Sequence, residues 1–120
     1  MKRTVVLGLL SALLVFVSAP LVVTAADSVT ITGEVIDTYC FALKGAKGEG
    51  HRQCAIDCVK AGIPAGLLED GSSKVYVLLP NEPKAPVPAG VIDKMAQKLS
   101  ITGKVYTVGG SQFLTVESFK

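Results

Sequence analysis

The sequence lacks several residue types that mark nucleic-acid-binding and membrane-surface proteins. It contains no tryptophan, 6% aromatic residues, and no excess of basic side chains once Lys2 and Arg3 are set aside. Phosphate backbones are bound by clustered Lys and Arg, and unpaired bases stack on aromatic side chains. A neutral chain with few aromatic residues therefore predicts neither a nucleic-acid partner nor electrostatic attraction to an anionic membrane.

Motifs of several enzyme and cofactor-binding classes are also missing. The three cysteines form no C-x-x-C or C-x-x-C-H pattern, which argues against a thioredoxin-like redox motif and covalent haem attachment. The glycine-rich segment 44–50 lacks the G-x-x-x-x-G-K-[ST] pattern of phosphate-binding loops. His51 and Cys54 could pair as base and nucleophile, but residues three apart on a helix rarely align as a catalytic triad does. Only Asp37 or Asp57 offers an orienting acid, so catalysis is not the expected function.

The first 26 residues have the pattern of a signal peptide. Lys2 and Arg3 precede an apolar run over 5–17, and the small residues up to Ala25 and Ala26 suit signal peptidase. The run is shorter than the roughly 20 apolar residues of a membrane-spanning helix. We therefore expect 1–26 to be a signal peptide and 27–120 to be a single domain, periplasmic or secreted. An uncleaved signal segment would be its only link to a membrane.

Residues 27–120 carry strand patterns interrupted by two helix patterns. Apolar and polar residues alternate over 28–39, where Gly33 suggests a bulge or bend. Helix-like spacing covers 51–61 and recurs over 91–99. Further strands are predicted from residue 66, over 74–79, over 100–108 and over 112–119, the last two joined by a turn at Gly109-Gly110.

This order of elements predicts a mainly β domain with one or two short helices. It fits an OB-like five-stranded barrel with a Cys/His-bearing helical insertion after strand 1. The alternative is a small α+β sandwich, but the bent first strand and the helix between strands three and four favour the barrel. The segment T-I-T-G-E-V (30–35) recurs as S-I-T-G-K-V (100–105), so strands one and four are expected to play equivalent roles.

Several motifs of the chain resemble those of a family of small exported bacterial proteins of uncharacterised function. The matching segments are G-E-V-I-D-T-Y-C, H-R-Q-C-A-I-D-C-V-K-A-G, K-V-Y-V-L, and T-G-K-V with L-T-V-E-S. The family pattern is D-x-x-C, H-x-x-C-A-x-x-C-V-x-x-G and V-Y-x-L on an OB-like scaffold, and the resemblance covers 33–118. It implies the fold but no activity, because a fold does not by itself give a function.

All three cysteines and the only histidine lie between residues 40 and 58. Helical spacing places His51, Cys54 and Cys58 within about a 60° arc of one helix face, directed toward the scaffold. Cys40 is expected at the end of the first strand. Three thiolates and an imidazole suit zinc, and thiolates also suit copper(I). We therefore predict a metal or metallocofactor site of Cys40, His51, Cys54 and Cys58.

A structural disulfide is the alternative for an exported domain. Cys54 and Cys58 are a poor pair, because residues four apart on a helix have Cβ atoms about 5–6 Å apart and a disulfide needs about 3.5–4.5 Å. Cys40 with Cys54 or Cys58 would instead fasten the helix to the first strand and leave one thiol over. Such a domain would be a binding module without metal, with an unknown envelope protein as its partner.

Overall fold

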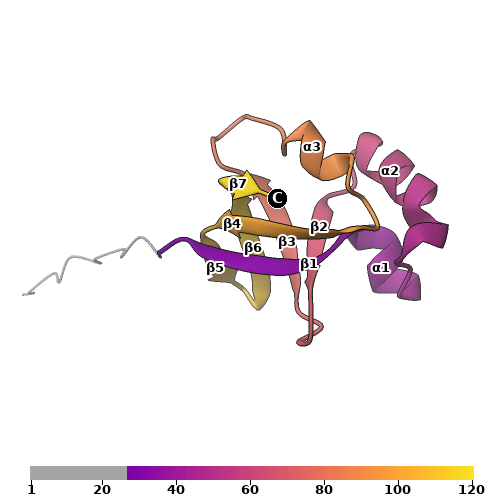
Figure 1. Ribbon diagram of the computed structural model, residues 1–120, viewed down its shortest axis with the longest axis horizontal. Coiled ribbons are helices and arrows are strands. Elements are labelled where there is room, and N and C mark those ends of the chain that lie inside the picture. Colours follow the sequence, from indigo (N-terminus) through magenta and orange to yellow (C-terminus); the bar gives the residue numbers. More distant parts are fainter. Residues whose placement is uncertain (1–26) are drawn as a thin grey trace, which may run out of the picture.

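The structure, a computed structural model, describes residues 27–120, and the signal peptide predicted over 1–26 lies outside this part. The described chain is mainly β, with seven strands in one open sheet and a few short helices (Figure 1). The sheet order is β5-β6-β3-β2-β1-β4-β7. The strands are β1 (Val29–Asp37), β2 (Ala65–Glu69), β3 (Val75–Pro80), β4 (Lys98–Gly103), β5 (Val105–Val108), β6 (Ser111–Val116) and β7 (Ser118–Phe119).

Most of the helical structure lies in the connection between β1 and β2. It consists of α1 (Thr38–Lys44), the 3-10 turn η1 (Glu49–His51) and α2 (Arg52–Lys60), while α3 (Ala89–Ile92) lies between β3 and β4. Figure 1 shows α1 and α2 side by side at the end of the sheet where β1 ends, away from β5 and β6. The predicted helical insertion after strand 1 is therefore present. Within 27–120, no helix is long and apolar enough to cross a membrane.

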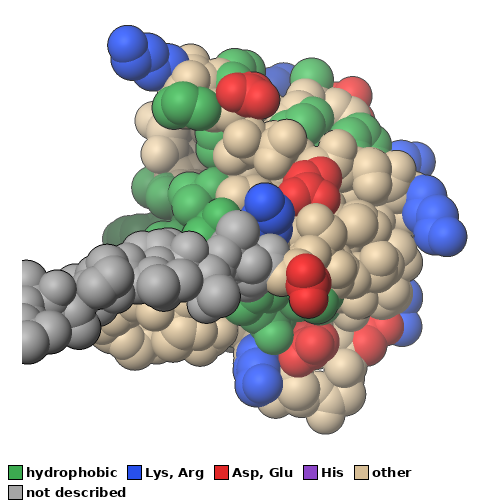
Figure 2. Space-filling model, turned by 90° about the vertical axis from the view of Figure 1, so that its left-hand side faces the viewer, with side chains coloured by type: hydrophobic (Ala, Val, Ile, Leu, Met, Phe, Trp, Pro, Cys, Tyr) green, Lys and Arg blue, Asp and Glu red, His purple; other side chains and the backbone are tan. Residues whose placement is uncertain are grey.

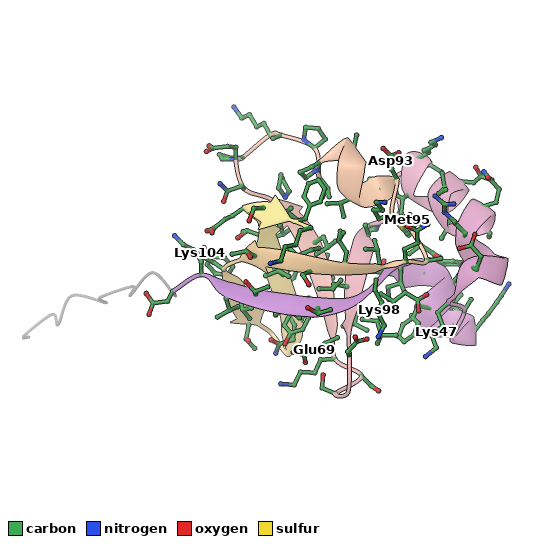
Figure 3. All side chains as sticks on the ribbon, in the orientation of Figure 1. Lys47, Glu69, Asp93, Met95, Lys98 and Lys104 are labelled. Carbon is green, nitrogen blue, oxygen red and sulfur yellow. The ribbon has the colours of Figure 1, made fainter. Side chains whose placement is uncertain are left out.

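The core is built from the alternating apolar residues of the strands. Val35, Leu67, Ile101 and Leu114 come from four different strands and are completely buried. Met95, which follows α3, is completely buried as well and closes this core (Figure 3). Within each strand, successive side chains point to opposite faces of the sheet, so every second residue faces the core.

The two copies of the repeated segment, in β1 and β4, are antiparallel neighbours in the sheet. Ile31 lies opposite Ile101 at the centre of the pair. On the other face, the hydroxyls of Thr30 and Thr102 lie 2.7 Å apart, and those of Thr32 and Ser100 lie 2.6 Å apart. This near-symmetric pairing of β1 with β4 agrees with the expectation that the two strands play equivalent roles.

Each copy also contains a glycine that lets another strand approach closely. A Cβ atom at Gly33 would lie 2.1 Å from the carbonyl oxygen of Leu68, and one at Gly103 would lie 1.7 Å from that of Thr115. Both separations are far below van der Waals contact, so only glycine fits. This agrees with the bend expected at Gly33, since interior glycines mark bends and close approaches.

The helix predicted over 91–99 is wrong after Ile92, where α3 ends. After α3 the chain turns and enters β4 at Lys98. The Ala96 N–H donates to the Val35 carbonyl (2.7 Å), and the Val35 N–H donates to the Gln97 carbonyl (3.0 Å). These bonds join residues 96–97 to β1, and this pairing outweighs the helix-like spacing of the apolar residues.

Two predicted strands also have different bounds. The first ends at Asp37, because Thr38–Lys44 is helical, and the strand predicted over 100–108 is divided at Lys104 into β4 and β5. The Lys104 N–H donates to the Thr115 hydroxyl (2.9 Å), and the Lys104 carbonyl accepts from the Thr115 N–H (3.0 Å). The closed five-stranded barrel is not confirmed, because the sheet is open.

The surface of the described chain carries charges of both signs. Figure 2 shows acidic and basic side chains interspersed on one face, with a group of hydrophobic side chains beside them. One exposed ion pair joins the β2–β3 turn to β4, where the Lys98 ammonium lies 2.9 Å from Asp70.

Candidate metal centre

The site begins at Asp37, where β1 ends and α1 starts. Its backbone is extended (φ −84°, ψ 135°), and its Oδ1 accepts a 2.7 Å hydrogen bond from the Cys40 N–H. This is the geometry of an aspartate that caps a helix N-terminus. Cys40 consequently lies in the first turn of α1 and is buried, so its predicted position at a strand end is wrong.

The second oxygen of Asp37 binds His51. His51 Nε2 lies 2.8 Å from Asp37 Oδ2, and Asp37 is completely buried while the His51 side chain is 18% exposed. His51 ends η1 and directly precedes α2. One buried carboxylate therefore joins the start of α1 to the start of α2.

The Asp37 carboxyl is held in its ionised form. Burial raises the pKa of Asp37, but hydrogen bonds from the Cys40 N–H and from His51 outweigh burial and hold the pKa below its ordinary value. A carboxylate can only accept hydrogen bonds, so the proton between the two side chains belongs to His51 Nε2. In a neutral imidazole with its proton on Nε2, the free lone pair is on the other ring nitrogen, Nδ1.

The glycine-rich loop brings His51 back to α1. Gly45 ends α1 with a left-handed conformation (φ 63°), and its N–H donates to the Phe41 carbonyl. Gly48 is also left-handed (φ 79°), and its N–H donates to the Glu34 carboxylate on β1. Glycine adopts positive φ without a steric penalty, so these two glycines allow the chain to turn back here.

Helix α2 carries the remaining two cysteines, one turn apart. Cys54 is exposed and Cys58 is half-buried, whereas Ala55 is the buried residue of this helix. The sequence predicts that both cysteines are directed toward the scaffold. This is wrong for Cys54, which is exposed, and only partly correct for Cys58, which is half-buried.

The potential ligand atoms form two groups that share Cys40. In one, the ligand atoms of Cys40, His51 and Cys54 all lie within 4.8 Å of one another. In the other, the same holds for Asp37, Cys40 and Cys58. The four predicted ligands are thus brought to one place, and either group could hold a metal ion.

All three cysteines are free thiols, and no two sulfur atoms lie at disulfide distance. Burial raises the pKa of Cys40 to about 12, helped by the neighbouring Cys58 thiol and the negative charge of Asp37. Burial also raises the pKa of Cys58. Both thiols are protonated at neutral pH in the metal-free protein, and a metal ion would have to displace these protons.

Asp37 is the member of the site that the spacing of cysteines and histidine did not reveal. It caps the N-terminus of α1. Its contact with His51 depends on the path of the glycine-rich loop, which the sequence does not define. The one sequence signal is the D-x-x-C motif. An aspartate that caps a helix accepts a hydrogen bond from the N–H of the residue two or three positions later, and Cys40 lies three positions after Asp37.

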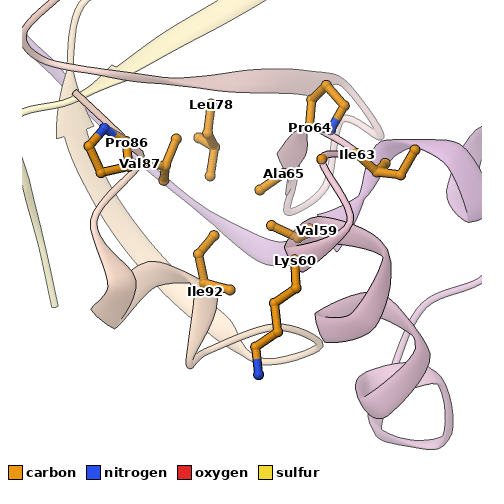
Figure 4. Close-up of a pocket in the computed structure, with 10 residues that line it drawn as sticks. Val59, Lys60, Ile63, Pro64, Ala65, Leu78, Pro86, Val87 and Ile92 are labelled. Atoms are coloured by element: carbon orange, nitrogen blue, oxygen red, sulfur yellow. The ribbon is translucent and has the colours of Figure 1, made fainter. Parts of the chain in front are cut away.

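An apolar pocket lies at the other end of α2, near its C-terminus (Figure 4). Its volume is about 460 Å³, and it is bounded by α2, β3, α3 and the connection from β3 to α3, which contains several prolines. Its lining is Val59, Lys60, Gly62, Ile63, Pro64, Ala65, Leu78, Pro86, Val87 and Ile92. None of the four predicted ligands lines it, so it is separate from the metal centre.

Comparisons with protein-family models, with curated proteins and with solved structures found no match for this chain. The assignment of a function therefore depends on the site itself.

Proposed function

We propose that this protein is a small exported domain that binds zinc or copper with ligands drawn from Cys40, His51, Cys54 and Cys58. The observation that carries the proposal is the position of Cys40, whose sulfur belongs to both groups of potential ligands. Thiolate and imidazole ligands suit these metals, whereas magnesium and calcium take oxygen ligands.

The Asp37–His51 hydrogen bond supports the proposal. Metal-bound histidines almost always donate their second ring N–H to a carboxylate, a carbonyl or water, which fixes the ring and makes the ligating nitrogen more basic. Here Nε2 is bound to Asp37 at 2.8 Å, which leaves Nδ1 as the ring nitrogen available to bind a metal. Asp37 would orient the imidazole without itself binding the ion.

The resemblance to small exported bacterial proteins and the OB-like interpretation belong to the same proposal. The parallel pairing of β3 with β6 and the pairing of β1 with β4 support an OB-like strand arrangement. The bonds from Thr115 to Lys104 and from Glu117 to Thr102 add to this support. In the periplasm or outside the cell, such a domain would meet metal ions rather than nucleic acids.

The test is metal analysis with thiol counting on protein purified from the compartment to which it is exported. We expect one zinc or copper ion per chain, and we expect Cys40→Ser to remove it because Cys40 serves both groups. Asp57→Asn is the matched control, since Asp57 lies on the same helix but is exposed and binds only Gln53. A metal-free protein with one titratable thiol, and a mass lower by about two hydrogens, would instead identify a disulfide-stapled binding module.

A further inference from the structure

The arrangement of ligand atoms distinguishes between a closed tetrahedral site and a three-coordinate one. Among the described residues, the potential ligands form two groups of three and no group of four. A tetrahedral zinc site of four protein ligands, at about 2.0–2.3 Å from the metal, needs all four donor atoms within about 4 Å of one another. The described structure therefore favours a site with three protein ligands over one with four.

The two groups differ in the quality of their donors. The group of Cys40, Cys54 and His51 offers two sulfurs and one imidazole nitrogen. The group of Asp37, Cys40 and Cys58 includes a carboxylate whose two oxygens already accept from the Cys40 N–H and from His51. A hard oxygen ligand that is already hydrogen-bonded is the poorer partner for a soft metal.

Two sulfurs and one imidazole suit copper(I) without a further ligand, because copper(I) is soft and readily three-coordinate. Zinc is almost always four-coordinate, so with these three protein ligands it would need water as its fourth ligand. The group also has an open side, because Cys54 is exposed at the surface of α2 while Cys40 is buried. A copper(I) ion held there could be exchanged with an incoming thiol or thioether through Cys54.

We propose that the bound metal is copper(I), held by the Cys40 and Cys54 sulfurs and by His51 Nδ1, with Cys58 outside the coordination sphere. This rests on the proposed function and narrows it to one metal and three ligands. It makes Cys54 and Cys58, one turn apart on the same helix, unequal in their contribution to binding.

The experiment compares Cys54→Ser with Cys58→Ser in the mature protein. Copper(I) affinity is measured anaerobically by competition with bicinchoninate, and X-ray absorption counts the atoms bound to copper. We expect Cys54→Ser to weaken binding by more than about 100-fold, since the loss of a ligand exceeds the 10–100-fold effect of its supporting groups. Cys58→Ser should bind like the wild type, and the spectrum should show two sulfurs and one nitrogen.

Two results would overturn the inference and leave the proposed function intact. One is an equal loss of affinity in both variants, together with three sulfur ligands in the absorption spectrum. The other is zinc bound tightly by the wild type and lost in both variants, with no comparable binding of copper(I). Failure of the wild type to bind either metal would instead overturn the proposed function itself.

Discussion

At the scale of single residues, Asp37 determines the arrangement of the site. It caps α1, which places Cys40 in the first helical turn, and it binds His51, which places the imidazole beside the same cysteine. A completely buried carboxylate is costly unless it is hydrogen-bonded, and here each of its oxygens has a partner. One residue thereby positions two ligands that are eleven positions apart in the sequence.

Replacing Asp37 with asparagine separates these two tasks. Asparagine caps helices about as well as aspartate, so α1 should be retained. The amide carries no charge to support His51, and metal affinity should fall about 10–100-fold. Isothermal titration of the metal-free protein measures the affinity, and Asp57→Asn is the control. An Asp37→Asn protein with unchanged affinity and a native circular dichroism spectrum would show that the carboxylate does not support the ligand.

The three thiols of the metal-free protein should differ in reactivity. A thiol with a pKa of about 12, as burial gives Cys40, is ionised in only about one molecule in 10,000 at pH 8. Since the thiolate is the reactive form, iodoacetamide should label exposed Cys54 first, Cys58 later and Cys40 last. Peptide mapping by mass spectrometry gives the order. Labelling of Cys40 ahead of Cys54 would contradict the burial described above.

At the scale of elements, the sequence was informative where local pattern and tertiary pairing agree. The alternation in β1 and the helical spacing of α2 predicted both elements nearly to their ends. Helix α1 was missed because Thr38 and Tyr39 favour strands and continue the preceding pattern. The Asp37 cap, together with its contact to His51, redirects the chain there. Contacts of this kind between distant segments cannot be recognised from the spacing of neighbouring residues.

The end of the helix predicted over 91–99 was missed for a similar reason. Leu99 and Ile101 fit a strand as well as Val91 and Met95 fit a helix, so the pattern alone does not define the boundary. Hydrogen bonds between residues 96–97 and Val35 decide it in favour of the sheet. The metal ligands could be identified from their residue types, but their division into two groups of three depends on the positions of α1 and α2.

The two glycines of the repeated segment should tolerate no side chain. In Gly33→Ala and Gly103→Ala the new methyl group would meet the backbone of Leu68 or of Thr115, which is fixed by sheet hydrogen bonds. We expect each change to cost about 3 kcal/mol, the upper end of the usual range for overpacking. Gly50→Ala is the control, because nothing lies within 4 Å of a Cβ atom there. Urea denaturation measures all three, and equal stabilities would contradict the close approach.

At the scale of the whole molecule, the metal centre lies beside the main cluster of buried apolar residues, although Cys40 is itself buried. The cluster of buried apolar residues contains none of the four predicted ligands. The sheet should therefore fold without metal, unlike a zinc finger.

Chelation should leave the far-ultraviolet circular dichroism unchanged and lower only the melting temperature. A metal that binds only the folded state raises the free energy of unfolding, by about 2.7 kcal/mol when the free metal concentration is 100 times the Kd. Chelation removes this contribution. His51→Ala, which should bind metal poorly, should melt at the same temperature with and without the chelator. Loss of the β-sheet spectrum on chelation would show that the metal is needed for folding.

The raised thiol pKa predicts how the stability of the metal-free molecule depends on alkaline pH. An unfolded cysteine ionises near pH 9, whereas folded Cys40 keeps its proton to about pH 12. Between these values the unfolded state binds fewer protons than the folded state, so the free energy of unfolding falls as pH rises. Burial raises the pKa of Tyr76 as well, which adds to the decline above pH 10. Urea denaturation from pH 8 to 11 should show this decline, with a smaller slope in Cys40→Ala and in Tyr76→Phe. An identical slope in Cys40→Ala and the wild type would mean that the Cys40 thiol ionises as readily in the folded protein as in the unfolded chain.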